Sequence, residues 1–77
     1  MPELPRSSGN RTVAVLRTLG FEVARQRGSH IVLRRIVPGG KVGCAVPLHK
    51  QLAAGTLREI LRQAHVTVEE FVAAMDA

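Results

Sequence analysis

The sequence predicts a small α+β domain in which a three-stranded antiparallel sheet carries helices on one face. Near both ends of the chain, apolar residues recur every three or four positions, as they do on one face of a helix. In the middle, the period is two and β-branched residues are frequent, which is typical of strands. With 77 residues the chain is long enough for one domain, which we expect to span residues 1–77.

The first helix is expected to begin after Ser7 or Ser8 and to end at Gly20. A serine hydroxyl can accept a hydrogen bond from an unpaired amide of the first turn, and glycine readily adopts the left-handed conformation that ends many helices. Two more helices are expected in the last third, because residues 56–59 and 67–70 each fit the capping-box pattern. The apolar faces of the three helices are formed by Val13, Leu16 and Leu19, by Leu57, Ile60, Leu61 and Ala64, and by Val68, Phe71, Val72 and Met75.

Three strands are expected between the first and second helices. Apolar and polar residues alternate from Phe21 to Gln26, the next strand is rich in β-branched residues, and the third is stopped by Pro47. Glycine, serine and proline mark the two turns between the strands. The expected strands span residues 21–26, 30–37 and 41–46, and the turns lie at residues 28–29 and 38–40.

The register of the first hairpin determines where His30 points. A two-residue turn would pair Arg27 with His30. It would also place Arg34 beside Val23, which mixes charged and core residues on one face. A three-residue loop pairs Gln26 with His30 instead, and we expect this register because a one-residue shift would reverse every side chain. It places Phe21, Val23, Ile31 and Leu33 on the buried face, and Gln26, His30, Val32 and Arg34 on the open face.

The charge balance favours a polyanionic partner. Eleven Lys and Arg residues face six acidic residues, so the net charge is +5, and nine of the cations are Arg, whose planar guanidinium matches phosphate. We therefore expect a nucleic acid partner, the alternative being a basic surface that only keeps the protein soluble.

The remaining composition favours the cytoplasm. The lone cysteine, Cys44, can form no internal disulfide and fits a reducing compartment; we expect it to be a small buried packing residue. No apolar run approaches the roughly 18 residues of a membrane span, and no signal peptide opens the chain. The expectation is a cytoplasmic protein without a membrane partner.

Three blocks of the sequence resemble the HicA toxin family. Residues 19–21 and 25–30 are similar to a family signature that runs from Gly-Phe to Arg-Gln-x-Gly-Ser-His. Residues 46–49 resemble its Val-Pro-x-His strand end, and residues 55–71 resemble its tail from Gly-Thr-Leu-Arg to Glu-Glu-Phe. The blocks fall in the same order and spacing over roughly residues 4–75, which makes the resemblance specific. The order of helices and strands alone is similar to that of double-stranded-RNA-binding domains.

The resemblance implies a double-stranded-RNA-binding-domain-like fold and the activity of a messenger RNA interferase, an endoribonuclease that cuts messenger RNA without the ribosome. It implies that His30, in the Gly-Ser-His motif, is the functional histidine, and that a HicB-type antitoxin protein binds the toxin and covers this residue. The sequence departs from the family pattern at His65, where glycine is common, and at Leu33, where an aromatic residue is frequent.

His30 suits RNA cleavage without a metal ion. A histidine can take the proton from the ribose 2′-hydroxyl or protonate the leaving oxygen. Arg25, Arg27 or Arg34 could stabilise the negative charge on the phosphorane. The strand position alone favours a solvated surface histidine, whereas the Gly-Ser-His context favours catalysis.

Other residues near the motif are expected to support RNA binding. Gly28 supplies turn geometry, and Ser29 either binds phosphate or completes the hairpin. His49, beside Lys50, is expected to contact phosphate or to be a surface histidine rather than a second acid–base group. The residues expected to bind RNA or support the site are Arg25, Gln26, Arg27, Gly28, Ser29, Arg34, His49 and Lys50.

No metal or cofactor is expected, because the acidic residues, histidines and cysteine show no ligand spacing. The two aromatic residues, Phe21 and Phe71, fall on core faces, so bases have no stacking platform. Binding should lean on phosphates, with little sequence preference and a steep salt dependence. Two alternatives stay open: an RNA-binding module of the same fold without catalysis, and a protein that has kept only antitoxin binding.

Overall fold

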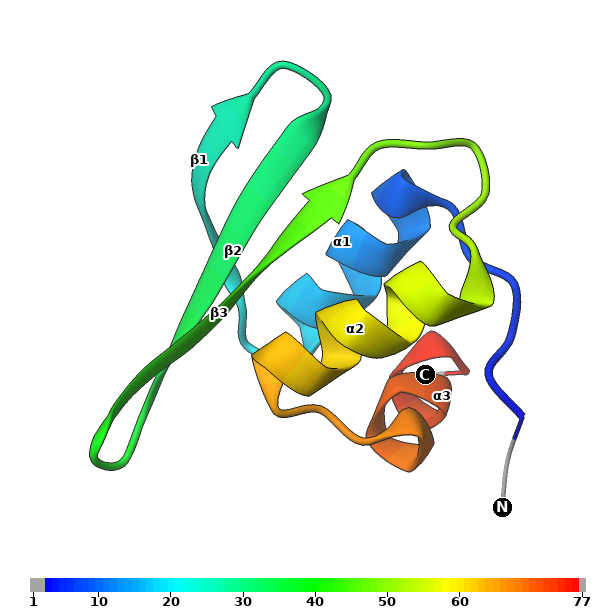
Figure 1. Ribbon diagram of the computed structural model, residues 1–77. Coiled ribbons are helices and arrows are strands. Elements are labelled where there is room, and N and C mark those ends of the chain that lie inside the picture. The colour runs from blue at the N-terminus through cyan, green and yellow to red at the C-terminus, as the bar shows by residue number, and fades with distance from the viewer. Residues whose placement is uncertain (1–2, 77) are drawn as a thin grey trace.

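A computed structural model describes residues 3–76. The strands form one antiparallel sheet in the order β1-β2-β3. Helices α1 and α2 lie on one side of this sheet, and α3 contacts α1 (Figure 1). The predicted α+β class, with a three-stranded antiparallel sheet of the double-stranded-RNA-binding-domain-like kind, is confirmed. The elements are α1 (Gly9–Thr18), β1 (Glu22–Arg27), β2 (His30–Val37), β3 (Gly40–Pro47), α2 (Ala54–Ala64) and α3 (Val68–Met75).

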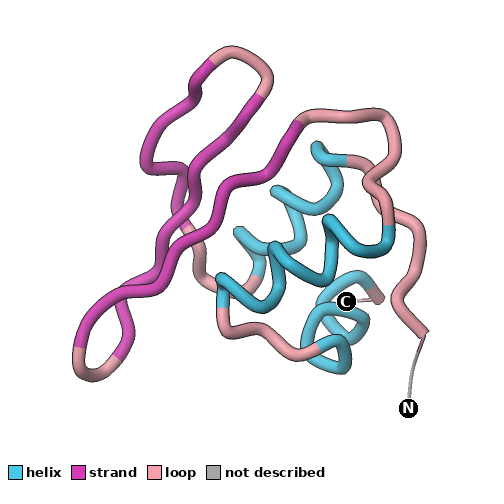
Figure 2. Tube along the Cα trace, in the orientation of Figure 1, coloured by secondary structure: helices cyan, strands magenta, loops and turns pink. Residues whose placement is uncertain are grey.

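The core lies between the sheet and the three helices, and every layer contributes to it. Leu33 of β2 and Val46 of β3 are fully buried, as are Leu16 of α1, Leu57 of α2 and Phe71 of α3. Burying one such side chain contributes about 1.5–3 kcal/mol to the free energy of unfolding, and a domain this small needs each of them. The two turns of the sheet extend beyond the helices at opposite ends (Figure 2).

Helix α1 begins and ends where the sequence predicts. Ser8 is the N-cap, and its hydroxyl accepts a hydrogen bond from the Arg11 amide at 3.0 Å. Ser7, the alternative cap, is buried instead, with its hydroxyl 2.8 Å from that of Thr12. Gly20, which follows the C-cap residue, has φ 97°.

Arg35 of β2 ties the end of α1 to the sheet. Its Nη1 donates a hydrogen bond to the Leu19 carbonyl at 3.0 Å, and its guanidinium carbon lies 4.9 Å from the centre of the Phe21 ring. A cation at a helix C-terminus stabilises the helix dipole, and the ring face attracts the same charge. The half-buried arginine therefore holds β2 in a fixed position relative to α1.

The register of the first hairpin was predicted correctly at one end and wrongly at the other. Val23 pairs with Leu33 as the apolar pattern requires, yet the turn has two residues and Arg27 pairs with His30. The difference arises at Ala24, where a β-bulge shifts the register by one residue. An extra residue in one strand lets a tight turn and a core-matched register coexist.

The bulge corrects the placement of two residues. Gln26 pairs with Ile31 and so lies on the face opposite to that of His30, not beside it. Val23, although paired with Leu33, is 45% exposed rather than buried, because α1 and α2 pack mainly against β3, at the other edge of the sheet. The tight turn itself has Gly28 at φ 55° in its first position, which is where a type II′ hairpin turn places glycine.

Helix α2 begins earlier than predicted. Its N-cap is Ala53, whose side chain makes no capping hydrogen bond, and Thr56 lies inside the helix. The first predicted capping box was therefore wrong. The C-cap, His65, adopts the left-handed conformation with φ 57°, which glycine adopts more readily than histidine.

The second predicted capping box, at the start of α3, is confirmed. The Glu70 amide donates to the Thr67 hydroxyl at 3.0 Å, and the Glu70 carboxylate accepts from the Thr67 amide at 3.0 Å. The hydrogen bonds from Thr67 lower the pKa of the Glu70 carboxyl.

The start of α1 is in direct contact with the end of β3. The Gly9 amide donates a hydrogen bond to the His49 carbonyl at 2.9 Å. A Cβ atom at Gly9 would lie 2.2 Å from the Pro47 carbonyl oxygen, so only glycine allows this approach. Because Pro47 is the partner of His30 across the sheet, the contact also fixes the neighbourhood of His30.

We predict that Gly9→Ala lowers the free energy of unfolding by about 1–3 kcal/mol, since the added methyl group must displace backbone. Gly55→Ala is the matched control, because Gly55 is also in the first turn of a helix but a Cβ there meets nothing within 4 Å. It should leave stability unchanged or raise it by up to about 1 kcal/mol. Urea denaturation measures both; equal effects of the two substitutions would contradict the contact.

Candidate functional site

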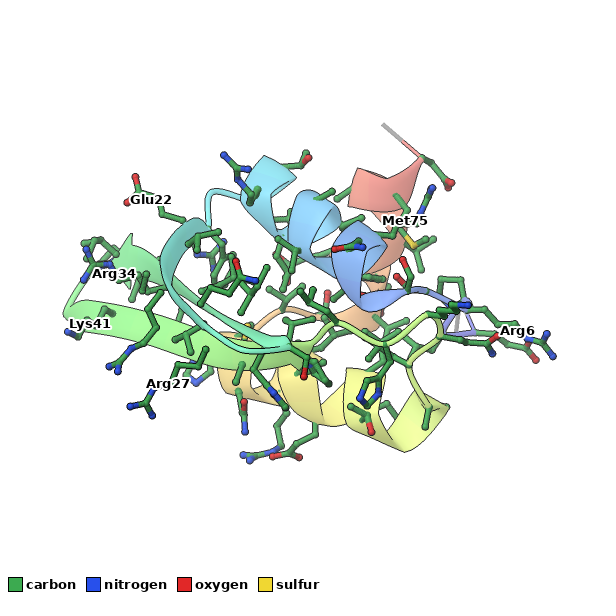
Figure 3. The ribbon with its side chains drawn as sticks, turned by 90° about the horizontal axis from the view of Figure 1, so that it is seen from above. Arg6, Glu22, Arg27, Arg34, Lys41 and Met75 are labelled. Carbon is green, nitrogen blue, oxygen red and sulfur yellow. The ribbon has the colours of Figure 1, made fainter. Side chains whose placement is uncertain are left out.

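The site lies on the open face, which is the face of the sheet directed away from the helices. Leu33, Cys44 and Val46 are buried beneath the sheet, so the residues that alternate with them point to the other side. Arg27, Arg34 and Lys41 project from the sheet into solvent (Figure 3). By register, the open face carries Glu22, Arg25, Arg27, His30, Val32, Arg34, Ile36, Lys41, Gly43, Ala45 and Pro47.

His30 has a firmly held backbone and a free side chain. It is the first residue of the central strand and pairs with Arg27 on one side and Pro47 on the other. The Leu48 amide donates to the Ser29 carbonyl at 2.7 Å, which extends the ladder past His30. The imidazole is exposed, and within residues 3–76 it makes no hydrogen bond. Both ring nitrogens are therefore available to a substrate.

Three arginines of the predicted site share the open face with His30. Arg27 is directly opposite His30, Arg25 is opposite Val32, and Arg34 follows on the same strand as His30. All three arginines are exposed. Residues directly opposite each other in an antiparallel pair have Cα atoms about 4.5–5.5 Å apart, so Arg27 is the arginine nearest to His30 along the sheet.

The other predicted site residues lie at the same end of the sheet but not on its open face. Gln26 is on the opposite face, where its Nε2 donates to the Gly28 carbonyl at 3.4 Å and so supports the turn. Ser29 forms the turn together with Gly28. His49 and Lys50 are exposed and follow the end of β3, where the His49 backbone is bound to the start of α1.

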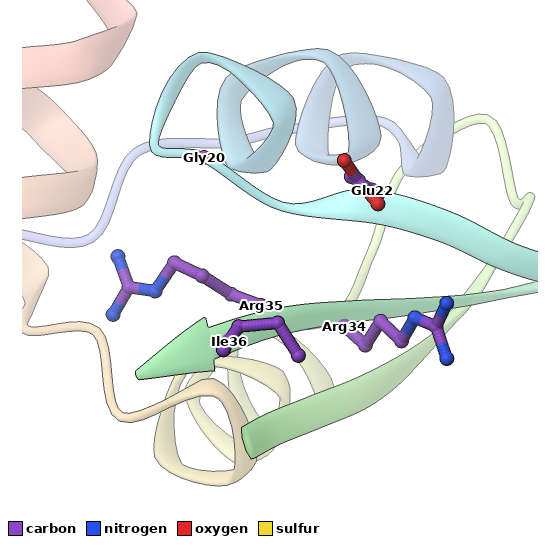
Figure 4. A pocket seen from close by; sticks show the side chains of 5 residues that line it. All are labelled: Gly20, Glu22, Arg34, Arg35 and Ile36. Atoms are coloured by element: carbon purple, nitrogen blue, oxygen red, sulfur yellow. The ribbon is translucent and has the colours of Figure 1, made fainter. Parts of the chain in front are cut away.

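Two hollows lie along the sheet. One, of about 390 Å³, is lined by residues of all three strands, among them Arg25, Arg34 and Lys41. The other, of about 210 Å³, is lined by Gly20, Glu22, Arg34, Arg35 and Ile36, with Arg34 and Arg35 extending in opposite directions (Figure 4).

Lys41 is the residue that the sequence analysis missed. It alternates with the partly buried Val42 and the buried Cys44, and this period of two was the available signal for an open-face cation. Cys44 fulfils the predicted packing role: it is 5% exposed, and burial raises the pKa of its thiol to about 11. The thiol is therefore protonated at neutral pH and is a poor nucleophile.

The described part of the chain, residues 3–76, contains no group of three or more His, Cys, Asp or Glu side chains that could hold a metal ion. Within the same residues, no helix has the length and apolar character needed to cross a membrane.

Comparison with known families gives one match that spans most of the fold. A family model described as "HicA toxin of bacterial toxin-antitoxin" matches residues 9–66, from the start of α1 to just beyond α2. A comparison with curated proteins gives no match. Since the family model covers more than half of the chain and includes the whole sheet, this protein belongs to the HicA toxin family of bacterial toxin–antitoxin systems.

Proposed function

We propose that the protein is a cytoplasmic endoribonuclease toxin that cleaves messenger RNA without a metal ion and uses His30 as its catalytic residue. The observation that carries this proposal is the position of His30. Its exposed imidazole stands on a rigid central strand, directly opposite Arg27, on a face that carries further cations. Membership of a toxin family supports the same reading.

The proposed reaction is a transesterification within the RNA. The His30 imidazole takes the proton from the ribose 2′-hydroxyl, whose oxygen attacks the adjacent phosphorus while the bond to the 5′-oxygen breaks. The products are a 2′,3′-cyclic phosphate and a 5′-hydroxyl, and the leaving oxygen takes a proton from water. Arg27, opposite His30, stabilises the extra negative charge that develops on the phosphorane oxygens.

We further propose that a HicB-type antitoxin inhibits the toxin by covering the open face. A partner with acidic side chains would neutralise Arg27 and Arg34, bind the His30 imidazole and exclude RNA by its bulk. Gln26, on the opposite face, would stay outside this contact. The helices lie on the other side of the sheet, so they need not take part (Figure 1).

We predict that His30→Ala reduces the rate of RNA cleavage about 100- to 10,000-fold, the usual contribution of a general acid or base. The fold should survive, because the side chain is exposed. His65→Asn is the matched control: it removes an exposed histidine at the end of α2, asparagine tolerates the left-handed conformation there, and the activity should be kept. Cleavage by His30→Ala at the wild-type rate, with circular dichroism confirming the fold, would refute the assignment. RNA binding without cleavage by the wild type would favour a non-catalytic module.

Cleavage is expected to persist in excess EDTA and to vary between about pH 5 and 8, where histidine side chains change charge. If a histidine acts as the base, the rate is expected to fall on the acidic side of this range, because only a neutral imidazole accepts a proton. Cleavage of a labelled RNA across this pH range, with and without EDTA, measures both effects. Activity that returns only with a divalent ion would exclude the metal-independent mechanism.

The antitoxin proposal predicts a pattern of amide hydrogen exchange. Binding of a HicB-type antitoxin should slow exchange in the β1–β2 hairpin around residues 28–30 and leave the exposed side of α2 unchanged. Mass spectrometry of the toxin with and without its antitoxin would measure this. Protection confined to α2 and α3 would mean that inhibition works by a route other than covering His30.

A further inference from the structure

The larger hollow on the open face lies where β3 carries a glycine. Gly43 is the partner of Arg34 and has no side chain to fill the space above the sheet. The hollow has a volume of about 390 Å³, within the range of about 300–1,000 Å³ typical of small-molecule sites. Val32 and Gly43 are among its lining residues and give it an apolar floor.

The rim of this hollow is basic and carries no acidic group. One cation comes from each strand: Arg25 from β1, Arg34 from β2 and Lys41 from β3. Within residues 3–76 the one ion pair joins Arg62 to Glu59, both on α2, so these three cations form no ion pair there. Glu22 lies opposite Arg34 in the sheet but does not line the hollow. Three cations around an apolar floor match a ligand that combines negative charge with an apolar ring.

We propose that this hollow is a subsite for a nucleotide of single-stranded RNA, adjacent to the nucleotide that is cleaved at His30. Arg25, Arg34 and Lys41 bind its phosphates, and Val32 contacts its ribose or base. This inference rests on the proposed function, because it places the subsite relative to the reacting phosphate.

The spacing along β2 supports the placement. Val32 follows His30 by two residues on the same face, which corresponds to about 7 Å along a strand. The cations continue from there across the sheet to Lys41, so the RNA strand runs from His30 over the hollow towards the second turn. A base that lies against Val32 must be unstacked from its neighbours, which excludes a duplex. An apolar floor without a side-chain hydrogen-bonding group accepts any base.

The test compares two double variants in a His30→Ala background, where RNA cleavage is expected to be about 100- to 10,000-fold slower. Arg25→Gln with Arg34→Gln removes two charges from the rim of the hollow. Arg17→Gln with Arg58→Gln removes two exposed charges from α1 and α2, and is the matched control. The probe is a fluorescent ten-nucleotide oligouridylate, whose affinity is measured over a range of salt concentrations.

For single strands the slope of log K against log salt concentration changes by about 0.7 for each phosphate contact, so the rim variant should reduce the slope by about 1.4 and the control should not change it. Lys41→Gln should reduce the slope by about a further 0.7. Equal slopes for rim and control variants would overturn the subsite. Tighter binding of a duplex than of the oligouridylate would also overturn it, as would rim variants that weaken antitoxin binding but not RNA binding.

Failure of the catalytic proposal would look different. RNA could be cut equally well with and without the His30 imidazole, while the rim variant still showed a smaller salt dependence of RNA binding. That result would refute the catalytic role of His30 and would still support the nucleotide subsite.

Discussion

The arrangement of the open face of the sheet depends on one extra residue in β1. The bulge at Ala24 lets Val23 pair with Leu33 at one end of the strand while Arg27 pairs with His30 at the other. Without it, a tight turn and the core-matched register would exclude each other, because side chains alternate with a period of two. The bulge therefore divides β1 into two halves with different pairing. The first half of β1 pairs Val23 with the core residue Leu33. The second half places the two arginines of the strand on the same face as His30.

The opposite side of the sheet is fixed at both ends of α1. At its start, Gly9 lies against Pro47, where even a methyl group would collide with backbone. At its end, Arg35 reaches from β2 to the Leu19 carbonyl and the Phe21 ring. Both contacts join the helix to strands that carry the site. A side chain that binds or reacts with a ligand needs a rigid support to hold its geometry, and here the open face is supported by the helices on the other face of the sheet.

Much of the fold could be predicted because the hydrophobic periodicity, the helix-capping residues and the turn residues indicate the same helices and strands along the chain. The position of His30 at the start of a strand follows from Gly28 and the β-branched run after it. The bulge could not be predicted, because nothing in the sequence around Ala24 indicates that this residue has no partner in the pairing of β1 with β2. The start of α2 was missed for a similar reason: Thr56 fits the capping pattern, yet the helix already begins at Ala54, and its N-cap Ala53 has no side-chain cap that the sequence could signal. The period of two in β3 indicated that Lys41 lies on the open face, but its position near Arg34 depends on the pairing of β3 with β2.

The open face also carries an electrostatic cost that bears on how such a protein is controlled. Arg25, Arg27 and Arg34 stand close together on one face, and in residues 3–76 they form no ion pair. Like charges held together in the folded state repel one another and lower the free energy of unfolding. A partner that supplies negative charge relieves this repulsion and binds only the folded state, so it stabilises the fold by mass action. If the proposed function holds, RNA and an acidic antitoxin bind the same surface and compete for it, because whichever neutralises the arginines also occupies the space above His30.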